Sequence, residues 1–279
     1  MRTVDTKVIT EAVRDMCIKC ATRLPEDVRK RMQELAAQEE SETAKRCFQQ
    51  LQENWDIAEA DGVPMCSDTG LAVMFVDVGD EVHFSGQHIR DAIDEGVRQG
   101  YKAAYCRSST THPFTRVNTG DNTPSTIYFN IVPGDKVRIG FMAKGGGSEN
   151  MSIHQMVTPA EGWEGVKKLA LKRIAEAGPN PCPPLVVGIG VGGNFEMSAL
   201  LAKKGFLRKL DDVNPDPDLA AKEAELLAEI NKLGLGPMAL GGKATCMGVK
   251  IAIFPCHIAT FPVAINIQCH MARHMEVEI

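Results

Sequence analysis

The chain has 279 residues, of which 44% are hydrophobic and 24% charged, and its formal net charge at pH 7 is -5. This length and composition allow a large buried core in one domain or in two closely packed lobes, and they exclude an intrinsically disordered chain. The negative net charge argues against nucleic acid as a partner. No apolar stretch approaches the roughly 20 residues needed to span a bilayer, so we expect no membrane insertion.

The cysteines and the N-terminal residues indicate a reducing compartment. Nine cysteines is an odd number, in a chain too long to need disulfides for its stability. The residues from Met1 to Asp5 lack the apolar segment of a signal peptide. We therefore expect a cytoplasmic protein with reduced thiols.

Residues 3 to about 61 predict helices. Apolar residues recur at helical spacing between Val4 and Met16, and Pro25 suits the first turn of a second helix. Ser41 is a suitable N-cap for a third helix, which Gly62 ends. The first 61 residues therefore form a helical segment of the expected fold.

The next 80 residues predict a strand, a helix, a long polar loop and a two-stranded hairpin. Their ranges are 71–78, 87–105, 106–124, and 125–132 with 136–143. The loop is long enough to suggest a function. Pro133-Gly134-Asp135 between the last two strands is typical of a tight turn, which favours a hairpin.

Three successive glycines, Gly145 to Gly147, follow the predicted hairpin. Glycine reaches backbone conformations that are closed to other residues, and a glycine-rich loop exposes N–H groups that can bind a carboxylate. A flexible connector is the alternative. Lys144 before the glycines and Ser148, Glu149 and Asn150 after them favour an anion site.

The second half of the chain alternates helices with strands, so we expect a mixed α/β fold. Thr158 to Glu161 has the pattern of a capping box, which opens a helix ending near Ala177. Asp216 and Pro217 cap another helix, which ends at Gly234. Further strands are expected at 185–187, 248–254 and 262–267.

The segment from Gly188 to Gly193 fits the pattern G-x-G-x-x-G between a strand and a helix. This pattern suggests a nicotinamide dehydrogenase, with Asp211 or Asp212 near the ribose. Those aspartates lie in a proline-broken loop, however, whereas the acidic residue of that fingerprint ends a second parallel strand. We therefore favour glycines that allow close backbone approach, with the helix N-terminus near a negative charge.

Three cysteines, Cys66, Cys182 and Cys269, each lie where an apolar run meets a turn. A structural cysteine usually lies within the apolar run, whereas one at a strand end can point into a cleft and bind a ligand. Cys17 and Cys20 are spaced as Cys-x-x-Cys, but they lie in an amphipathic helix pattern and are expected to pack in the core.

Several segments, in a fixed order, closely resemble the alpha subunits of the class I iron-sulfur hydro-lyases, the fumarate hydratase and L-tartrate dehydratase family. They are residues 66–70, 118–122, 144–150, 182–193 and 257–269. The resemblance covers nearly the whole chain. It implies one family domain over residues 1–279, in which the helical segment 1–61 is followed by mixed sheets and helices around a central cluster.

The resemblance implies a four-iron, four-sulfur cluster held by Cys66, Cys182 and Cys269. Three thiolates leave one iron open, and this iron would bind a hydroxyl and a carboxylate of the substrate as a Lewis acid. The spacing of the cysteines would not have shown this, because they lie far apart in the sequence and only a fold can bring them together.

The resemblance also implies roles for four other residues. Asp68 would be the acid that hands a proton to the leaving hydroxyl, although an aspartate there could simply cap the turn. Arg107 would bind a substrate carboxylate, for which a bidentate guanidinium is well suited, although a solvated loop charge is the ordinary alternative. Gly146 and Gly147 would hold an oxygen through their N–H groups.

His257 resembles a family histidine near the substrate, with a core histidine as the alternative. Two residues depart from the family: Ser67, in the substrate pocket, stands where Gln is common, and Met151 stands where Lys is usual. Gly145 to Asn150 resembles the fumarate hydratase branch, so hydration of fumarate to malate is the first expectation. An L-tartrate or mesaconate-type dehydratase remains the alternative, as does a non-catalytic assembly or sensory paralogue.

The resemblance further implies partners. Single-chain family members continue into a second domain that supplies the proton-abstracting residue, whereas this chain ends at Ile279. We therefore expect a separate beta subunit that completes the active site, together with pairing of two alpha chains and a small dicarboxylate substrate.

Overall fold

The computed structural model describes all 279 residues and divides the chain into two compact units. The first unit comprises residues 1–25, 53–146 and 273–279, and the second comprises residues 26–52 and 147–272. Each unit has its own sheet and its own apolar core. The mixed α/β class that the sequence predicts is confirmed, and the predicted helical segment 1–61 is divided between the units.

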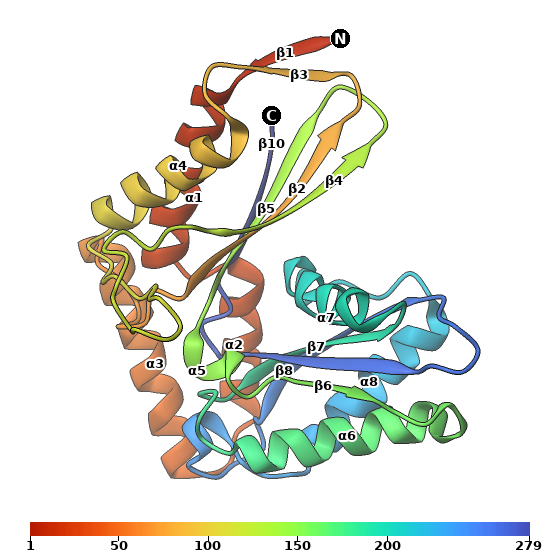
Figure 1. Cartoon of the computed structure of the whole chain (residues 1–279). Helices are drawn as coiled ribbons and strands as arrows, with labels where there is room; N and C mark the ends of the chain where they lie inside the picture. Colours follow the sequence, from red (N-terminus) through yellow and green to blue (C-terminus); the bar gives the residue numbers. More distant parts are fainter. The chain divides into compact units, whose positions relative to one another are not determined.

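The first unit is built on a four-stranded sheet with the strand order β10-β5-β2-β4. Helices α1 and α4 lie side by side against it (Figure 1). Gly100 of α4 permits their close contact, because a Cβ atom there would lie 2.5 Å from Cβ of Cys17. The elements are β1 (Arg2–Asp5), α1 (Thr6–Thr22), β2 (Leu71–Gly79), β3 (Val82–Ser85), α4 (Ile89–Ala103), β4 (Thr126–Val132), β5 (Val137–Lys144) and β10 (His274–Glu278).

The predicted hairpin of residues 125–143 is wrong, although both of its strands exist. β2 lies between β4 and β5, parallel to β4 and antiparallel to β5. The turn after β4 therefore crosses the end of β2, where the N–H of Gly79 donates to Lys136 O and the N–H of Glu81 to Gly134 O. These hydrogen bonds satisfy backbone N–H and C=O groups where the connection crosses the end of β2. A direct hairpin between β4 and β5 would contain no such crossing.

The second unit has a four-stranded sheet with the order β6-β9-β7-β8. Helix α7 covers one face of it, and α6 and α8 cover the other (Figure 1). Its elements are α2 (Glu26–Gln38), β6 (Ile153–Met156), α6 (Gly162–Ala177), β7 (Leu185–Gly192), α7 (Phe195–Lys204), α8 (Pro217–Asn231), β8 (Cys246–Phe254) and β9 (Pro262–Gln268). Between α2 and β6 in the sequence lies the short helix α5 (Gly146–Glu149), whose first residue belongs to the first unit. Three 3-10 turns, η1 (Pro159–Glu161), η2 (Gly205–Leu207) and η3 (Pro237–Ala239), complete the second unit. Helix α3 (Glu42–Asp61) runs from this unit into the first.

The glycines of the G-x-G-x-x-G pattern serve helix packing. Gly188 and Gly190 lie inside β7, where a Cβ atom would come within 2.0 Å of Ala202 O and 1.9 Å of Ser198 O in α7. The nicotinamide fingerprint instead needs these glycines in the turn after the strand. The close backbone approach expected from the sequence is therefore confirmed.

One cap differs from its prediction. The Thr158 side chain makes no capping hydrogen bond, because residues 159–161 form a 3-10 turn and α6 begins only at Gly162, which has a φ of 49°. The Asp216 cap is confirmed, since its carboxylate accepts hydrogen bonds from the N–H groups of Asp218 and Leu219. No helix is long and apolar enough to cross a membrane.

Candidate functional site

In the first unit, a turn that begins at Cys66 is anchored through the residue before it. The N–H of Met65, one residue earlier, donates to Ala21 O at 2.9 Å, and Met65 O accepts from Asn54 Nδ2 at 2.9 Å. The Cys66 sulfur is half-buried, forms no disulfide and accepts a hydrogen bond from the N–H of Asp68 at 3.4 Å. The sulfur therefore occupies a fixed place at the start of the turn.

The Asp68 carboxylate joins this turn to the end of β5. Its Oδ1 accepts the N–H of Gly70 at 3.0 Å, and its Oδ2 accepts the N–H of Gly146 at 2.7 Å. Gly70 is needed there, because its φ is 79° and a Cβ atom would lie 2.9 Å from the carbonyl carbon of Lys144. Asp68 thus caps the turn, as the simpler reading of the sequence has it, and it also fixes the glycine segment.

The main chain of Arg107 is held against the same turn. Its carbonyl accepts hydrogen bonds from Thr69 Oγ1 at 2.6 Å and from Asn122 Nδ2 at 3.2 Å. The residue itself is exposed. Its guanidinium forms no hydrogen bond or ion pair within the chain, so it is available for an anion. Ser67 is exposed on the turn as well.

The glycine segment differs from its prediction in one respect. Neither Gly146 nor Gly147 adopts the left-handed backbone conformation that would require glycine. Small size is what matters at Gly147, because a Cβ atom there would lie 3.0 Å from Asn180 O. The Gly146 N–H already donates to Asp68, so it could bind a substrate oxygen only by sharing or replacing that bond.

In the second unit, the fold brings the segments of Cys182 and Cys269 together. β7 and β9 are antiparallel neighbours, and Val186 lies opposite Gln268 at the end nearest to both cysteines. Next to Cys269, the backbone N–H of His270 donates to Cys182 O at 3.2 Å, and its Nδ1 donates to the same oxygen at 3.0 Å. Both cysteines are half-buried, and neither forms a disulfide.

His257 lies elsewhere in the second unit. It is exposed in the loop between β8 and β9, where its Nδ1 accepts the N–H of Ala259. Cys269 follows the other end of β9, a strand of seven residues, which is roughly 23 Å at about 3.3 Å per residue. Within one chain, therefore, His257 is not near the Cys182 and Cys269 end.

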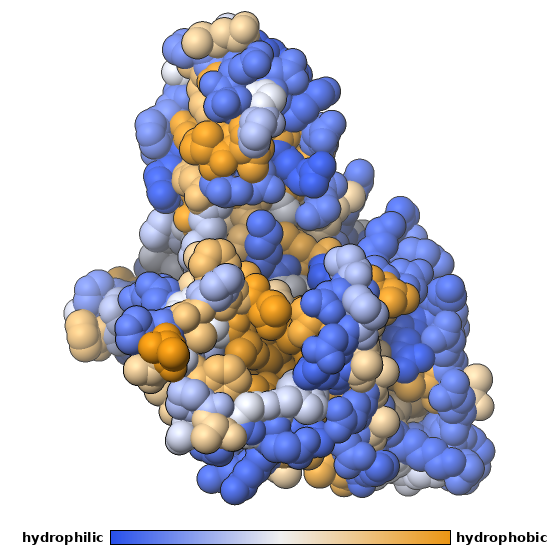
Figure 2. All heavy atoms as spheres, turned by 90° about the vertical axis from the view of Figure 1, so that its right-hand side faces the viewer, coloured by the Kyte–Doolittle hydropathy of each residue, from blue (hydrophilic) through white to orange (hydrophobic).

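The same loop carries exposed apolar residues. Ile258 within it is exposed, as are Ile253 and Phe254 at the end of β8 and Phe195 at the start of α7. Figure 2 shows apolar atoms at several places on this side of the molecule, among hydrophilic ones. Exposed apolar groups of this size often mark surfaces that contact other proteins.

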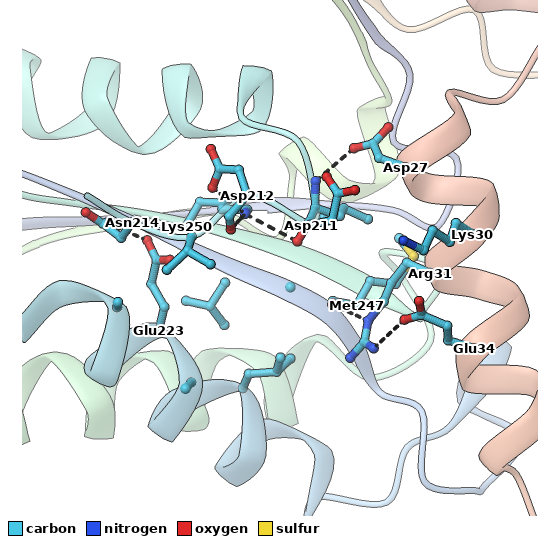
Figure 3. A pocket seen from close by; sticks show the side chains of 17 residues that line it. Asp27, Lys30, Arg31, Glu34, Asp211, Asp212, Asn214, Glu223, Met247 and Lys250 are labelled. Atoms are coloured by element: carbon cyan, nitrogen blue, oxygen red, sulfur yellow. Dashed lines mark hydrogen bonds and ion pairs between the residues drawn. The ribbon is translucent and has the colours of Figure 1, made fainter. Parts of the chain in front are cut away.

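A cavity of about 330 Å³ lies between α2, α8 and β8 in the second unit (Figure 3). Its polar groups are largely paired with one another. Lys250 donates to the backbone oxygens of Leu210 and Asp212 and to the Asp212 carboxylate, and Glu223 accepts from Asn214. The cavity therefore offers a ligand few unpaired buried groups, and of the residues singled out from the sequence only Asp211 and Asp212, the candidates for the nicotinamide alternative, line it.

Comparison with known proteins identifies the family. The family described as fumarate hydratase (Fumerase) matches residues 10–278. A Methanocaldococcus jannaschii protein named "Putative L(+)-tartrate dehydratase subunit alpha" is 41% identical over 271 residues, 95% of each chain. The L(+)-tartrate dehydratase subunit alpha of Escherichia coli strain K12 is 32% identical over 269 residues, 95% of this chain and 88% of the relative. The chain belongs to the fumarate hydratase family.

Membership confirms the resemblance and the enzyme class, a hydro-lyase, that the sequence predicts. The names of the relatives correct the first expectation for the substrate, because they fit the tartrate dehydratase alternative better than fumarate hydratase. Both relatives are named as alpha subunits, as expected for a chain with a partner.

The residues present suit an iron-sulfur cluster. No cysteine of the chain forms a disulfide, and all three predicted cysteine ligands are half-buried, whereas Cys17 and Cys20 are packed in the core of the first unit. Cys66 belongs to the first unit and Cys182 and Cys269 to the second. No group of three or more His, Cys, Asp or Glu side chains is placed to hold a single metal ion. The three-cysteine set therefore remains a prediction.

Sequence reasoning missed two residues beside these segments. His270 ties the Cys269 segment to Cys182, and Arg273 donates from Nη2 to Asp68 O at 3.1 Å. Both are buried. The available signal was a pair of basic residues that follows the apolar strand 262–267 without a turn-forming proline or glycine.

Proposed function

We propose that the chain is the alpha subunit of an iron-sulfur hydro-lyase that removes water from a hydroxy-dicarboxylate, with L(+)-tartrate as the first substrate to test. The tartrate assignment rests on the names of the relatives. Reversible hydration of fumarate to malate is the second candidate, because Gly145 to Asn150 resembles the fumarate hydratase branch. Both reactions need the same groups.

One observation in particular supports the cluster. The β7 and β9 register, together with the two hydrogen bonds from His270 to Cys182 O, puts two of the three predicted cysteine ligands at one end of neighbouring strands. The third, Cys66, is anchored in the turn that also holds Asp68.

The chain's own residues would bind and protonate the substrate. When bound, such a cluster supplies a Lewis acid at the iron that has no thiolate ligand. The free guanidinium of Arg107 would bind one substrate carboxylate in bidentate fashion. Asp68, held by two N–H donors, would give a proton to the departing hydroxyl so that it leaves as water.

The remaining step is removal of a proton from the neighbouring carbon. We assign it to a beta subunit, because the relatives are named as alpha subunits and the resemblance places that base outside this chain. Two alpha chains would also pair. The exposed apolar residues around the β8 and β9 loop are candidates for one of these contacts.

The first test is cluster binding by the chain itself. Anaerobic reconstitution of the purified chain should give about four irons per chain with broad visible absorbance. Cys66→Ser, Cys182→Ser and Cys269→Ser should each lose most of that absorbance. Cys256→Ser is the matched control, because Cys256 is exposed in the β8 and β9 loop, and it should bind iron as the wild type does. Full iron content in Cys182→Ser would refute the ligand assignment.

The second test separates the substrates. With intact cluster and a cognate beta subunit, consumption of L(+)-tartrate, fumarate and mesaconate is followed side by side. The proposal expects the highest kcat/KM with L(+)-tartrate. A preference for fumarate would favour the second candidate. Saturable NADH binding by a chain that binds no iron would instead favour the nicotinamide dehydrogenase alternative.

A further inference from the structure

Arg273 is a buried cation without an ion pair. It lies between β9 and β10 in the first unit, and only 2% of its surface is exposed. Its Nη2 donates to the backbone oxygen of Asp68 at 3.1 Å, and its Nε has no hydrogen-bond partner. Burying a charge without a counter-ion is strongly unfavourable, so a protein retains one only where something offsets the cost.

The side chains around Arg273 do not offset its charge. Burial raises the pKa of the Cys20 thiol to about 12 and raises that of Cys106, while Arg273 itself only partly opposes the effect. Burial likewise raises the pKa of Tyr101, whose hydroxyl has no hydrogen-bond partner. The two thiols and the Tyr101 hydroxyl are therefore neutral at pH 7, so none of the three gives the Arg273 guanidinium a negative neighbour.

The other side of Arg273 is the Cys66 to Gly70 turn. The guanidinium contacts the Asp68 carbonyl, whereas the Asp68 carboxylate is directed at the N–H groups of Gly70 and Gly146. Arg273 thus holds the main chain of the residue that the proposed function makes the proton donor. Asp68 lies two residues after Cys66, which is a proposed cluster ligand.

We propose that Arg273 is a positioning residue that fixes the Asp68 main chain and supplies the positive charge for an anionic iron-sulfur cluster bound at the Cys66 turn. This inference rests on the proposed function, because the cluster is the anion. It explains why a buried arginine is tolerated without a carboxylate partner. It also predicts opposite effects of removing the charge in the cluster-free and the cluster-loaded protein.

Without the cluster, the charge of Arg273 is unpaired, so replacing it with an apolar side chain of similar length should not reduce stability. With the cluster, the same replacement removes a favourable interaction and should weaken binding. A purely structural arginine would behave differently, because its loss would destabilise the cluster-free protein and leave iron binding by the folded protein unchanged.

The experiment compares Arg273→Met, Arg273→Lys and the wild-type full chain, each prepared anaerobically with and without cluster. Arg138→Met is the matched control, because Arg138 is an exposed arginine on β5 of the same unit with a surface partner, Glu278. Two quantities are measured: the denaturant midpoint of the cluster-free chain, and the rate at which the loaded chain gives up iron to a chelator. Neither depends on catalytic activity.

We expect Arg273→Met to lose iron at least about tenfold faster than the wild type, which corresponds to about 1.4 kcal/mol. Its cluster-free midpoint should equal or exceed that of the wild type. Arg273→Lys keeps the charge and should retain iron to within about threefold of the wild type, about 0.7 kcal/mol on the same scale. Arg138→Met should change neither quantity.

Several results would overturn the inference. Wild-type iron retention in Arg273→Met would refute it and leave the proposed function standing. Arg273→Met could fail to fold without the cluster, and Arg273→Lys then decides. If Arg273→Lys folds but loses iron as fast as a variant of a proposed cysteine ligand, the inference is refuted. A wild-type chain that binds no iron would refute both the inference and the proposed function.

Discussion

At the scale of single residues, Asp68 has a structural role in the turn and a proposed chemical role as proton donor. Its carboxylate receives two backbone N–H groups, and its carbonyl receives a guanidinium. A residue held by three hydrogen bonds from Gly70, Gly146 and Arg273 is restricted in orientation, which is what a proton donor needs. The same bonds make it a turn cap, so the two readings of the sequence are compatible.

Asp68→Asn tests the chemical role. Asparagine keeps the shape but has no acidic proton to give, and its single amide oxygen can accept only one of the two backbone N–H groups that the two carboxylate oxygens accept. With intact cluster, beta subunit and substrate, kcat should fall about 100-fold or more, while KM changes much less. Iron content and steady-state kinetics check this expectation. A near-normal kcat would show that Asp68 acts only as a cap of the turn.

At the scale of elements, the packing of α7 on β7 depends on glycine. The space at Gly190 is closed, because a Cβ atom would lie 1.9 Å from Ser198 O and 2.7 Å from Ala202 N, both backbone atoms. Backbone of a packed helix cannot yield as a flexible side chain can. The register of β7 and β9, which places Cys182 beside Cys269, is part of the same unit.

Gly190→Ala should therefore destabilise the protein by about 1–3 kcal/mol or prevent folding, because it overpacks the contact between strand and helix. Gly205→Ala is the control, since its Cβ would meet nothing closer than 3.5 Å and its φ of -54° suits alanine. That change should stay within about 0.5 kcal/mol. Thermal midpoints of both variants provide the measurement, and equal midpoints would contradict the packing argument.

A second element-scale feature is the junction of α2 and α3. Burial raises the pKa of the Glu39 carboxyl, but four backbone N–H donors outweigh burial and hold that pKa below its ordinary value. Two of the donors follow Glu39 directly, and the others are Lys243 and Ala244 before β8. The carboxylate thus ties two distant segments of the second unit together.

Glu39→Gln should lower the free energy of unfolding at pH 7 by about 1–3 kcal/mol, because the amide has one acceptor oxygen in place of two and hydrogen bonds to a charged acceptor are stronger than those to an amide. The folded-state pKa of Glu39 is depressed, so its contribution is fully present above about pH 4.3, the ordinary value of Glu, and is lost as the pH falls further. Denaturant titrations at pH 7 and near pH 3.5 test this. A gap between variant and wild type that does not narrow at the lower pH would contradict it.

At the scale of the whole molecule, the sequence predicted local elements better than their pairing. Caps and glycine stops predicted α3 and α8, because these signals act within a few residues. It missed β1, β3, β6 and β10, which are short and owe their existence to distant partners such as β5 for β10. It misjudged the β4 and β5 hairpin for the same reason, since β2 inserts between them.

The site shows the same limit. The motif order singled out three cysteines as candidate ligands, but only the β7 and β9 register brings the segment of Cys182 close to that of Cys269. Arg273 was invisible to sequence reasoning, because arginine is usually solvated and nothing local reveals its burial. The predicted strand 262–267 corresponds to β9, which separates His257 from Cys269. Sequence reasoning did not use the length of this strand to judge whether His257 could lie near Cys269.

The last prediction concerns the division of the active site between subunits. Asp68 and Arg107 are the proposed proton donor and carboxylate-binding cation of this chain, but His257 lies at the far end of β9 from Cys269. We therefore expect the alpha chain alone to bind its cluster and to turn over L(+)-tartrate or fumarate at less than about 1% of the rate of the mixture with a cognate beta subunit, because loss of a positioned base typically costs 10²–10⁴-fold. Alpha alone, beta alone and the mixture are assayed anaerobically with intact cluster, and His257→Asn is assayed in the mixture. Full turnover by alpha alone would show that this chain contains its own base. Normal turnover by His257→Asn would remove that histidine from the mechanism.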